Sequence, residues 1–456
     1  RAAIEVTGGL DPQKTRIIVR DDVKPDPQLQ IDRATNTSRE SPGDQPGIED
    51  HGPLNIVRLS GTPYEMGWQQ GQAHQASLRR ILHRYADLAG TRWDWILRSD
   101  ETATHQHFGP HECEELRGIA DGAGVSLESL IAHNLRLFQD NGGGGIHLAL
   151  SAQSDQVASL LHASNEDLRI GLSVSDCLER QIQVRHPHNG FAHLNFAVAG
   201  QVGALNGINS KGVAVSAAAI LDCPAHLTET GGPLQTVRVK NILEAADTVQ
   251  QAIEICRQSP GDSAWSLILS HHLTDDICYL EYDGSSLQVD TPRSQVIASN
   301  HRLNEGNTNT SSRSLNRLVR LQQLLDNDDG QMITPERLQK ALRDRFDTKR
   351  GQQLPTSSLN TVRRVDNQIS VVMQPATGRI WVTPGNVIPE QQDHFTEINV
   401  ETLLAGSVAR ESHKETPVLQ HAGPLSGGSD PQCPTAYGTS RIRKNSFQTP
   451  ACQRDF

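Results

Sequence analysis

The chain has 456 residues, which is long enough to bury the core of one large domain or two ordinary ones. Its formal net charge of -11 argues against nucleic acid and anionic membranes as main partners. Only 36% of the residues are hydrophobic and 4% aromatic, so part of the chain is expected to stay unpacked.

The two ends of the chain are polar. Residues 1–52 are rich in Asp, Pro, Arg, Asn and Ser, and they are expected to form a disordered N-terminal arm. Residues 389–456 lack any apolar period and are expected to form a disordered tail. No apolar run approaches the roughly 20 residues that cross a bilayer, so no membrane span is expected.

A helical layer is predicted for residues 54–140. After a short strand, LNIVRL, a turn containing Pro63 starts a helix in which Gly67 and Gly71 stand four residues apart on one face. Small residues at that spacing let another element approach closely, and tight helix packing is the favoured interpretation. Two further helical patterns, HECEELRGIA and LESLIAHNLRLF, complete the layer.

A run of glycines that ends at Gly145 breaks this pattern, and short strands follow it. Helices return at Gln235–Arg257, Ser312–Leu325 and Pro335–Arg345, and two closing strands, ISVVMQP and RIWVTPG, form a hairpin. Helices and strands come in blocks rather than in βαβ alternation, which favours an α+β fold with antiparallel sheets.

Six segments between about residues 54 and 388 attract attention together. They are Gly61–Gly71, Glu114–Val125, the glycine run with Leu160–Asp167, Leu205–Val215, Ser299–Leu303 with Ser314–Leu321, and the ISVV…GRIWVTPG hairpin. In order and spacing these segments resemble the acyl-CoA:6-aminopenicillanate acyltransferase family of N-terminal-nucleophile (Ntn) hydrolases.

The resemblance implies an αββα sandwich over residues 53–388, with two stacked antiparallel sheets between helical layers. Residues 53–144 would be the helical pro-region or small subunit, and residues 145–388 the part that bears the nucleophile. Members of the family cut themselves before a cysteine, whose thiol attacks C–N amide bonds while its own amine, with a pKa of about 7.7 to 8.0, serves as the base. The resemblance implies an amide or acyl substrate and no cofactor.

The position that corresponds to this cysteine is Gly145. Family sequences resemble G-C-T-x-F-A at the cut, whereas this chain has G-G-I-H-L-A from Gly144 onwards. Glycine has no side chain and cannot attack a carbonyl. The nearest hydroxyls, on Ser151 and Ser154, lie within the following strand, and a shift of that size removes a nucleophile from its catalytic neighbours.

Other positions of the family site are occupied. Asn165 and Asp167 match an N-x-D segment that holds the nucleophile's amine, although Asn and Asp are also common turn residues. Asn209, or less favourably Asn206, matches the oxyanion region, although it also fits a hairpin loop. A second asparagine that the family has in the next strand is absent here.

Ser314 and Arg317 match the family's S-x-x-R helix start, which supports the polar end of the substrate or the site itself; an ordinary solvated arginine is the alternative. The paired histidines of the chain lack partners at zinc spacing, so no metal site is expected. The seven cysteines contain no CxxC pair and indicate isolated thiols.

Three functional interpretations are open at this level. In the first, the chain is an amidase or acyltransferase, and Gly145 is an engineered replacement of its natural cysteine or a sequence error. In the second, it is a degenerate homologue that binds an acyl or amide ligand or a protein partner without turnover. The third interpretation is an unrelated α+β binding protein, which a structure without two stacked antiparallel sheets would establish. The sequence indicates no compartment.

Overall fold

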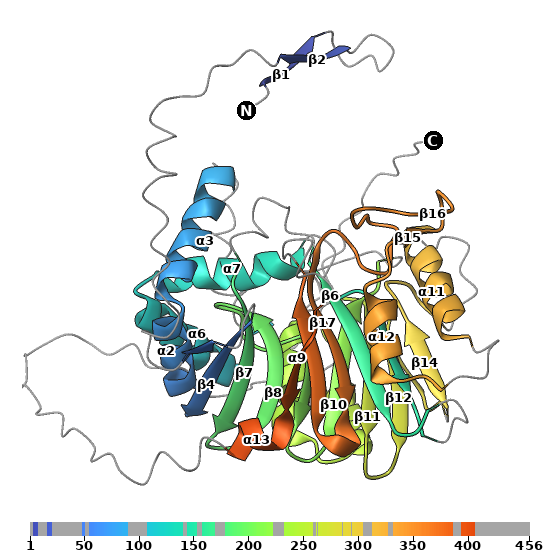
Figure 1. Ribbon diagram of the computed structural model, residues 1–456. Coiled ribbons are helices and arrows are strands. Elements are labelled where there is room, and N and C mark those ends of the chain that lie inside the picture. The colour runs from blue at the N-terminus through green and yellow to red at the C-terminus, as the bar shows by residue number, and fades with distance from the viewer. Residues whose placement is uncertain are drawn as a thin grey trace, which may run out of the picture. The chain divides into compact units, whose positions relative to one another are not determined.

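The computed structural model describes residues 3–7, 16–20, 48–50, 54–89, 107–139, 144–152, 157–168, 178–221, 232–258, 261, 263–284, 286–292, 294–303, 312–326, 332–385 and 394–405. Two large sheets dominate these residues (Figure 1). One has nine strands in the order β13-β12-β11-β10-β9-β8-β7-β4-β3, and the other has six in the order β14-β5-β6-β17-β18-β19. Apart from the parallel pair β4–β7, neighbouring strands in both sheets are antiparallel.

The strands of the nine-stranded sheet are β3 Ile48–Asp50, β4 Asn55–Gly61, β7 Arg180–Pro187, β8 His193–Val198, β9 Asn206–Asn209, β10 Val213–Ala219, β11 Trp265–His271, β12 Asp276–Tyr282 and β13 Leu287–Asp290. Those of the six-stranded sheet are β5 His147–Leu150, β6 Leu161–Asp167, β14 Gln295–Ala298, β17 Asn367–Gln374, β18 Arg379–Pro384 and β19 Thr396–Asn399. Short hairpins pair β1 Ala3–Thr7 with β2 Arg16–Arg20, and β15 Phe346–Asp347 with β16 Gln352–Gln353.

The sheets face each other across a shared apolar core. Ile182 and Phe196 of the nine-stranded sheet pack in one cluster with Val371 and Ile380 of the six-stranded sheet. Because alternate side chains of a strand point to opposite faces, each sheet keeps a second face for helices.

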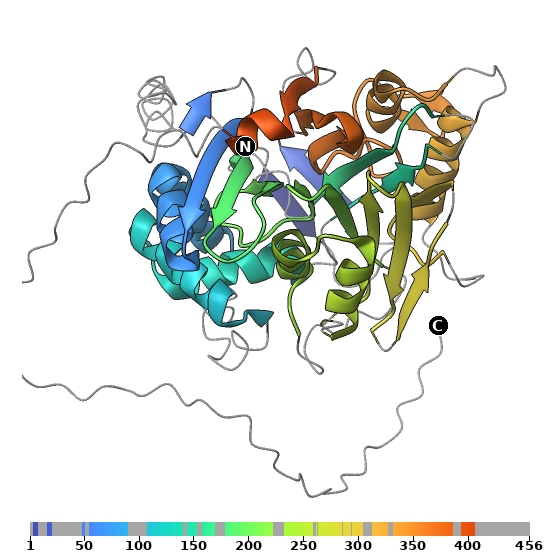
Figure 2. The same ribbon diagram turned by 90° about the horizontal axis from the view of Figure 1, so that it is seen from below.

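Helices cover both outer faces, as Figure 2 shows from below. The helices over the nine-stranded sheet are α2 Pro63–Ala73, α3 Gln75–Ala89, α6 Pro110–Ala123, α7 Leu127–Gln139, α9 Gln235–Ala245 and α10 Val249–Gln258. Those over the six-stranded sheet are α11 Ser312–Leu325 and α12 Pro335–Leu342. The expected αββα sandwich is therefore confirmed, and the structure does not lack the two stacked sheets whose absence would have established an unrelated α+β protein.

Helices α2 and α6 interlock through glycines. A Cβ atom placed on Gly67 would lie 2.1 Å from the carbonyl oxygen of Glu115, and one on Gly118 would lie 2.1 Å from that of Tyr64. Gly71 and Gly122 make equally close approaches one turn further along. The glycine face of α2 thus packs directly on the backbone of α6, which is the tight helix packing that the spacing of Gly67 and Gly71 predicts.

The domain boundaries expected from the sequence remain a prediction. Beyond residue 388, β19 pairs with β18, and α13 (Val400–Ala405) follows it with Val400 and Leu403 buried in the core between the sheets. Within residues 1–52 the structure describes only β1, β2 and β3; the remainder of that arm, and the tail after residue 405, lie outside the described residues. No helix among the described residues is long and apolar enough to span a membrane.

Candidate functional site

Gly144 and Gly145 lead directly into β5, one of the strands next to the edge of the six-stranded sheet. Gly144 has a φ of 89°, a conformation that glycine adopts without strain, and a Cβ atom there would lie 2.5 Å from the backbone of Ala217 and Ala218 in β10. The peptide bond between the two glycines therefore packs directly against the backbone of the facing sheet, with no side chain of Gly144 between them.

Position 145 has no room for a side chain. A Cβ atom built on Gly145 would lie 2.2 Å from Oδ2 of Asp167 and 2.8 Å from the carbonyl oxygen of Asn165. Asp167 ends the neighbouring strand β6, and its side chain is fully buried. The carboxylate of Asp167 therefore occupies the space into which a nucleophilic side chain at position 145 would extend.

Buried cations and an amide hold Asp167 in this position. The Nδ2 atom of Asn367 donates to Oδ1 at 3.1 Å, while Arg317 Nη1 and Arg364 Nε lie 3.5 and 3.6 Å from Oδ2. Burial raises the pKa of Asp167 to about 6, against the lowering effect of Arg364 and Arg317. Moving this carboxylate would leave buried positive charge without its partner.

Helix α11 brings Ser314 and Arg317 to the same place. Arg317 also donates to Oδ1 of Asn300 at 2.7 Å, and Ser314 contacts His301 and Ser299 at 2.7 and 3.1 Å. The side chain of Arg317 is only 2% exposed, so the alternative of a solvated arginine does not describe it. Through these contacts Ser314 and Arg317 lie in one cluster with Asp167 and Gly145, and their roles in a site stay predictions.

Asn300 also belongs to this cluster. It lies in the segment Ser299–Leu303 that carries part of the resemblance, but no role was predicted for it from the sequence. Its Nδ2 atom donates to the carbonyl oxygens of Ala219 at 2.9 Å and Gly144 at 3.4 Å. An amide donor on the carbonyl of Gly144 can stabilise negative charge that develops on that oxygen during attack on the Gly144–Gly145 bond.

Asn165 fixes the surrounding loops rather than facing a ligand. Its Nδ2 atom donates to the carbonyl oxygens of Leu342 and Val362, each at 3.0 Å, and its Oδ1 accepts from Ser370 at 2.7 Å. All of its side-chain polar atoms are engaged in ties between β6, the end of α12 and β17. What it presents to Gly145 is its backbone carbonyl.

Asn209 does not join the site. Its Nδ2 donates to the carbonyl oxygens of Leu243 and Ala246, and its Oδ1 accepts from the amides of Lys211 and Val213. Gly144 contacts the other end of β10, five residues beyond Val213, which corresponds to about 17 Å along a strand. These contacts are those of the loop alternative, and an oxyanion role for Asn209 stays a prediction that they do not support.

Asn206 lies nearer to β6, but on the face opposite Asp167. It accepts from Ser164 at 2.6 Å and donates to Glu166 at 3.2 Å. Burial raises the pKa of Glu166 to about 8, so this carboxyl is protonated near neutral pH.

A second polar cluster lies between the two sheets. Ser216 is 3.2 Å from Nδ1 of His147 and 2.7 Å from Nε2 of His162, and the far nitrogens of the two rings contact Ser266 and Ser270. Burial lowers the pKa of both histidines to about 3, so neither can act as an effective base near neutral pH. This network ties the two sheets together. Its central residue, Ser216, lies in β10, the strand in which the resemblance implied a second asparagine.

Among the described residues, the hydroxyls within the cluster are those of Ser314 and Ser299, which are hydrogen-bonded to each other, and Ser314 also lies 2.7 Å from Nδ1 of His301. Ser151 follows the far end of β5 and donates to Asp275. The described cysteines Cys113, Cys256 and Cys278 are free thiols, and burial raises the pKa of the last two to about 12. Ser154 lies outside the described residues. The described part of the chain also contains no group of three or more His, Cys, Asp or Glu side chains that could hold a metal ion.

Comparison with known proteins gives one family and several distant structures. The family model described as acyl-coenzyme A:6-aminopenicillanic acid acyl-transferase matches residues 155–388, a range that begins after Gly145. No curated protein matches the chain.

Similar solved structures include an N-acylethanolamine-hydrolyzing acid amidase ortholog from Caenorhabditis elegans, with 14% identity over 56% of this chain and 99% of that one, at a TM-score of 0.37. A mutant conjugated bile acid hydrolase from Clostridium perfringens has 12% identity over 57% of this chain and 94% of that one, at a TM-score of 0.37. Penicillin V acylase from Agrobacterium tumefaciens has 11% identity over 56% of this chain and 78% of that one, at a TM-score of 0.32.

Proposed function

Because the chain belongs to the acyl-coenzyme A:6-aminopenicillanic acid acyl-transferase family, we propose that it is a non-catalytic member of this group of amide hydrolases and acyltransferases. It binds an acyl or amide ligand without cutting it, and it does not cut its own chain before residue 145. A protein partner in place of the small ligand is the alternative occupant.

The proposal rests above all on the packing around Gly145. Simple replacement of a cysteine by glycine removes a CH₂SH group and leaves a hole of that size. Here the carboxylate of Asp167 fills the space instead, 2.2 Å from an ideal Cβ position. The surroundings have therefore adapted to glycine, which favours a lapsed site over an enzyme with one engineered change.

Two further observations support the same proposal. The base that an Ntn enzyme uses is the amine set free by cleavage, and glycine at position 145 offers no side chain to attack the preceding carbonyl. Among the described residues, the serine nearest to Gly145 in sequence is Ser151, which donates to Asp275 at the far end of β5.

The experiment is to purify the chain and its Gly145→Cys variant and to determine their intact masses after incubation at neutral pH. We expect both chains to remain whole, and we expect the variant to be less stable because Asp167 obstructs its side chain. Gly351→Cys is the control for open space, since a Cβ atom at Gly351 has no neighbour within 4 Å; its φ of 66° costs about 1 to 2 kcal/mol of backbone strain, which the loss in Gly145→Cys should exceed.

Splitting of the Gly145→Cys chain between residues 144 and 145 would overturn the proposal, because it would show machinery that lacks only a thiol. Binding is tested separately with a simple N-acyl amide. Calorimetry should detect its binding, while mass spectrometry of the same mixture should detect no released acid.

A further inference from the structure

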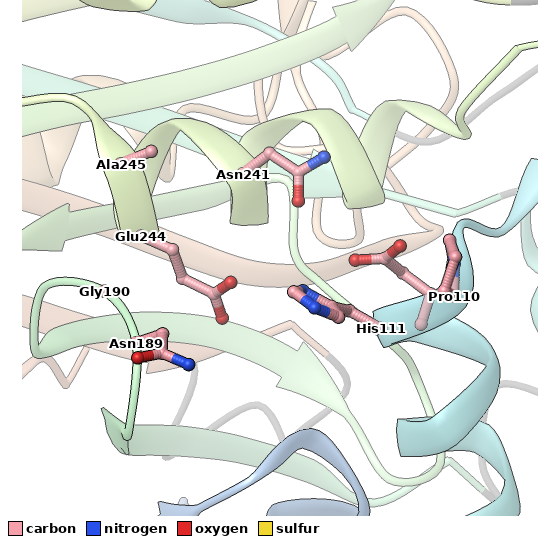
Figure 3. A pocket seen from close by; sticks show the side chains of 8 residues that line it. Pro110, His111, Asn189, Gly190, Asn241, Glu244 and Ala245 are labelled. Carbon is pink, nitrogen blue, oxygen red and sulfur yellow. The ribbon is translucent and has the colours of Figure 1, made fainter.

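A pocket lies on another part of the domain, far from Gly145. It has a volume of about 490 Å³, within the usual range for small-molecule sites, and it lies between the start of α6, the last turn of α9 and the β7–β8 turn (Figure 3). Asn209 hydrogen-bonds the carbonyl oxygens of Leu243 and Ala246 at this end of α9. The pocket is therefore at the Asn209 end of β10, opposite the end that contacts Gly144.

A buried ion cluster lies against this pocket. Lys240 Nζ is 2.8 Å from Glu112, 3.4 Å from Glu244 and 3.8 Å from Glu115, while Arg185 is 2.8 Å from Glu115 and 3.9 Å from Glu244. Three carboxylates thus share two cations, which leaves the set with a net charge of -1. An excess negative charge at a concave surface attracts a cation.

The side chain of Glu244 is the most exposed of the three, since those of Glu112 and Glu115 are only 7% and 0% exposed. It lies 3.4 Å from Lys240 and 3.9 Å from Arg185, and its Oε1 atom, like both carboxylate oxygens of Glu115, has no hydrogen-bond partner among the described residues. Its side chain is 15% exposed, and Figure 3 shows it directed into the space between Asn189 and His111, with Asn241 on the same helix. The amide oxygens of the two asparagines can accept further hydrogen bonds there.

His193, a histidine beside the ion cluster that does not line the pocket, does not cancel the excess charge. His193 on β8 is fully buried, and burial lowers its pKa to about 3, helped by Arg185. Its Nδ1 is 3.0 Å from the carbonyl oxygen of Phe191, which can only accept, so Nδ1 donates. Its Nε2 is left as an acceptor without a hydrogen-bond partner in the described structure.

The arrangement selects the kind of ligand. An anion would need Lys240 or Arg185, whose side chains are 2% and 0% exposed and already lie against carboxylates. A metal ion would need a cluster of ligands that the described residues do not contain. An organic cation needs one accessible carboxylate and a few acceptors for its N–H groups, which Glu244, Asn189 and Asn241 offer.

We propose that this pocket binds a small organic cation, a primary ammonium or a guanidinium group, with Glu244 as its counter-ion. The site is separate from the Gly145 cluster, and its occupation does not depend on whether the chain is catalytic. It gives the protein a binding function that its family assignment does not require.

The test compares three probes of the same length by titration calorimetry at low salt: hexylammonium, hexan-1-ol and hexanoate. The full chain should bind hexylammonium at least tenfold more tightly than hexan-1-ol, and it should not bind hexanoate measurably. Equal affinity for the three probes would overturn the proposal, because the recognition would then be apolar.

Two variants place the site. Glu244→Gln should weaken hexylammonium binding at least tenfold, whereas Glu254→Gln, whose side chain is 52% exposed on α10, should leave it unchanged. Because Glu244→Gln disturbs a buried cluster, Asn189→Lys provides an independent test: it puts a cation in the exposed β7–β8 turn and should also weaken binding at least tenfold. Unchanged affinity in either folded variant would contradict the assignment.

Discussion

Glu166 should make the protein less stable as the pH rises, and Glu166→Gln should remove that effect. Burial raises the pKa of this carboxyl from 4.5 to about 8 in the folded chain. Between these two values the folded state holds a proton that the unfolded state has lost, so the free energy of unfolding falls with increasing pH. The amide of glutamine has the shape of the protonated carboxyl and does not ionise.

The size of the effect follows from the two pKa values. With 4.5 and about 8, the penalty from Glu166 is about 1 kcal/mol at pH 5 and about 4 kcal/mol at pH 8. The stability difference between Glu166→Gln and the parent chain should therefore grow by about 3 kcal/mol over this range. Taking the difference cancels the contributions of titrating groups that do not interact with Glu166; the adjacent Asp167, whose charge raises the pKa of Glu166, does not cancel fully.

The assay is urea unfolding at pH 5, 6, 7 and 8 for the parent chain, for Glu166→Gln and for Glu254→Gln as an exposed control. The control should follow the parent at every pH. A constant difference between Glu166→Gln and the parent would refute the reasoning, because it would mean that Glu166 is ionised in the folded chain throughout.

Two other changes have clear expected outcomes. Burial lowers the pKa of His162 from 6.5 to about 3, so the folded chain keeps this ring neutral. Below pH 6.5 the unfolded chain binds a proton that the folded chain does not, and the free energy of unfolding falls. His162→Gln should remove this acid-induced loss, which is about 2 kcal/mol at pH 5, as urea unfolding can measure. Gly118→Ala should lower stability by about 3 kcal/mol in urea unfolding, because its Cβ would lie 2.1 Å from the Tyr64 carbonyl; a loss no larger than that of Gly351→Ala, where space is open, would contradict the interlock.

Much of the architecture could be predicted from local pattern and resemblance. Blocks of helix and strand indicated α+β layers, and the spacing of Gly67 and Gly71 indicated close helix packing, which the contacts with Glu115 and Tyr64 explain. Features that depend on distant partners were not predicted. Strand β7 lacks an apolar face towards the helices, where Gln181, Gln183 and Arg185 alternate, and it is buried only because side chains such as Glu115 meet it.

The site shows the same division. Asp167 and Arg317 could be located because each belongs to a short segment with a family counterpart, and the structure pairs them at 3.5 Å. The role of Asn209 could not be decided from the sequence, because a hairpin asparagine that anchors the end of a helix has the same local sequence as one that faces a ligand. The occupation of position 145 by a carboxylate could not be predicted either, since it depends on the packing of two strands.

The most direct measurement for the central claim is the stability of Gly145→Ala, which adds only the Cβ atom. If Asp167 fills the nucleophile's space, this change must displace a buried, ion-paired carboxylate, and urea unfolding should show a loss of about 3 kcal/mol or more. Gly351→Ala, in open space at a φ of 66°, should cost only about 1 to 2 kcal/mol of backbone strain. A Gly145→Ala chain as stable as the parent would contradict the account, because position 145 would then be an emptied nucleophile site with room for its side chain.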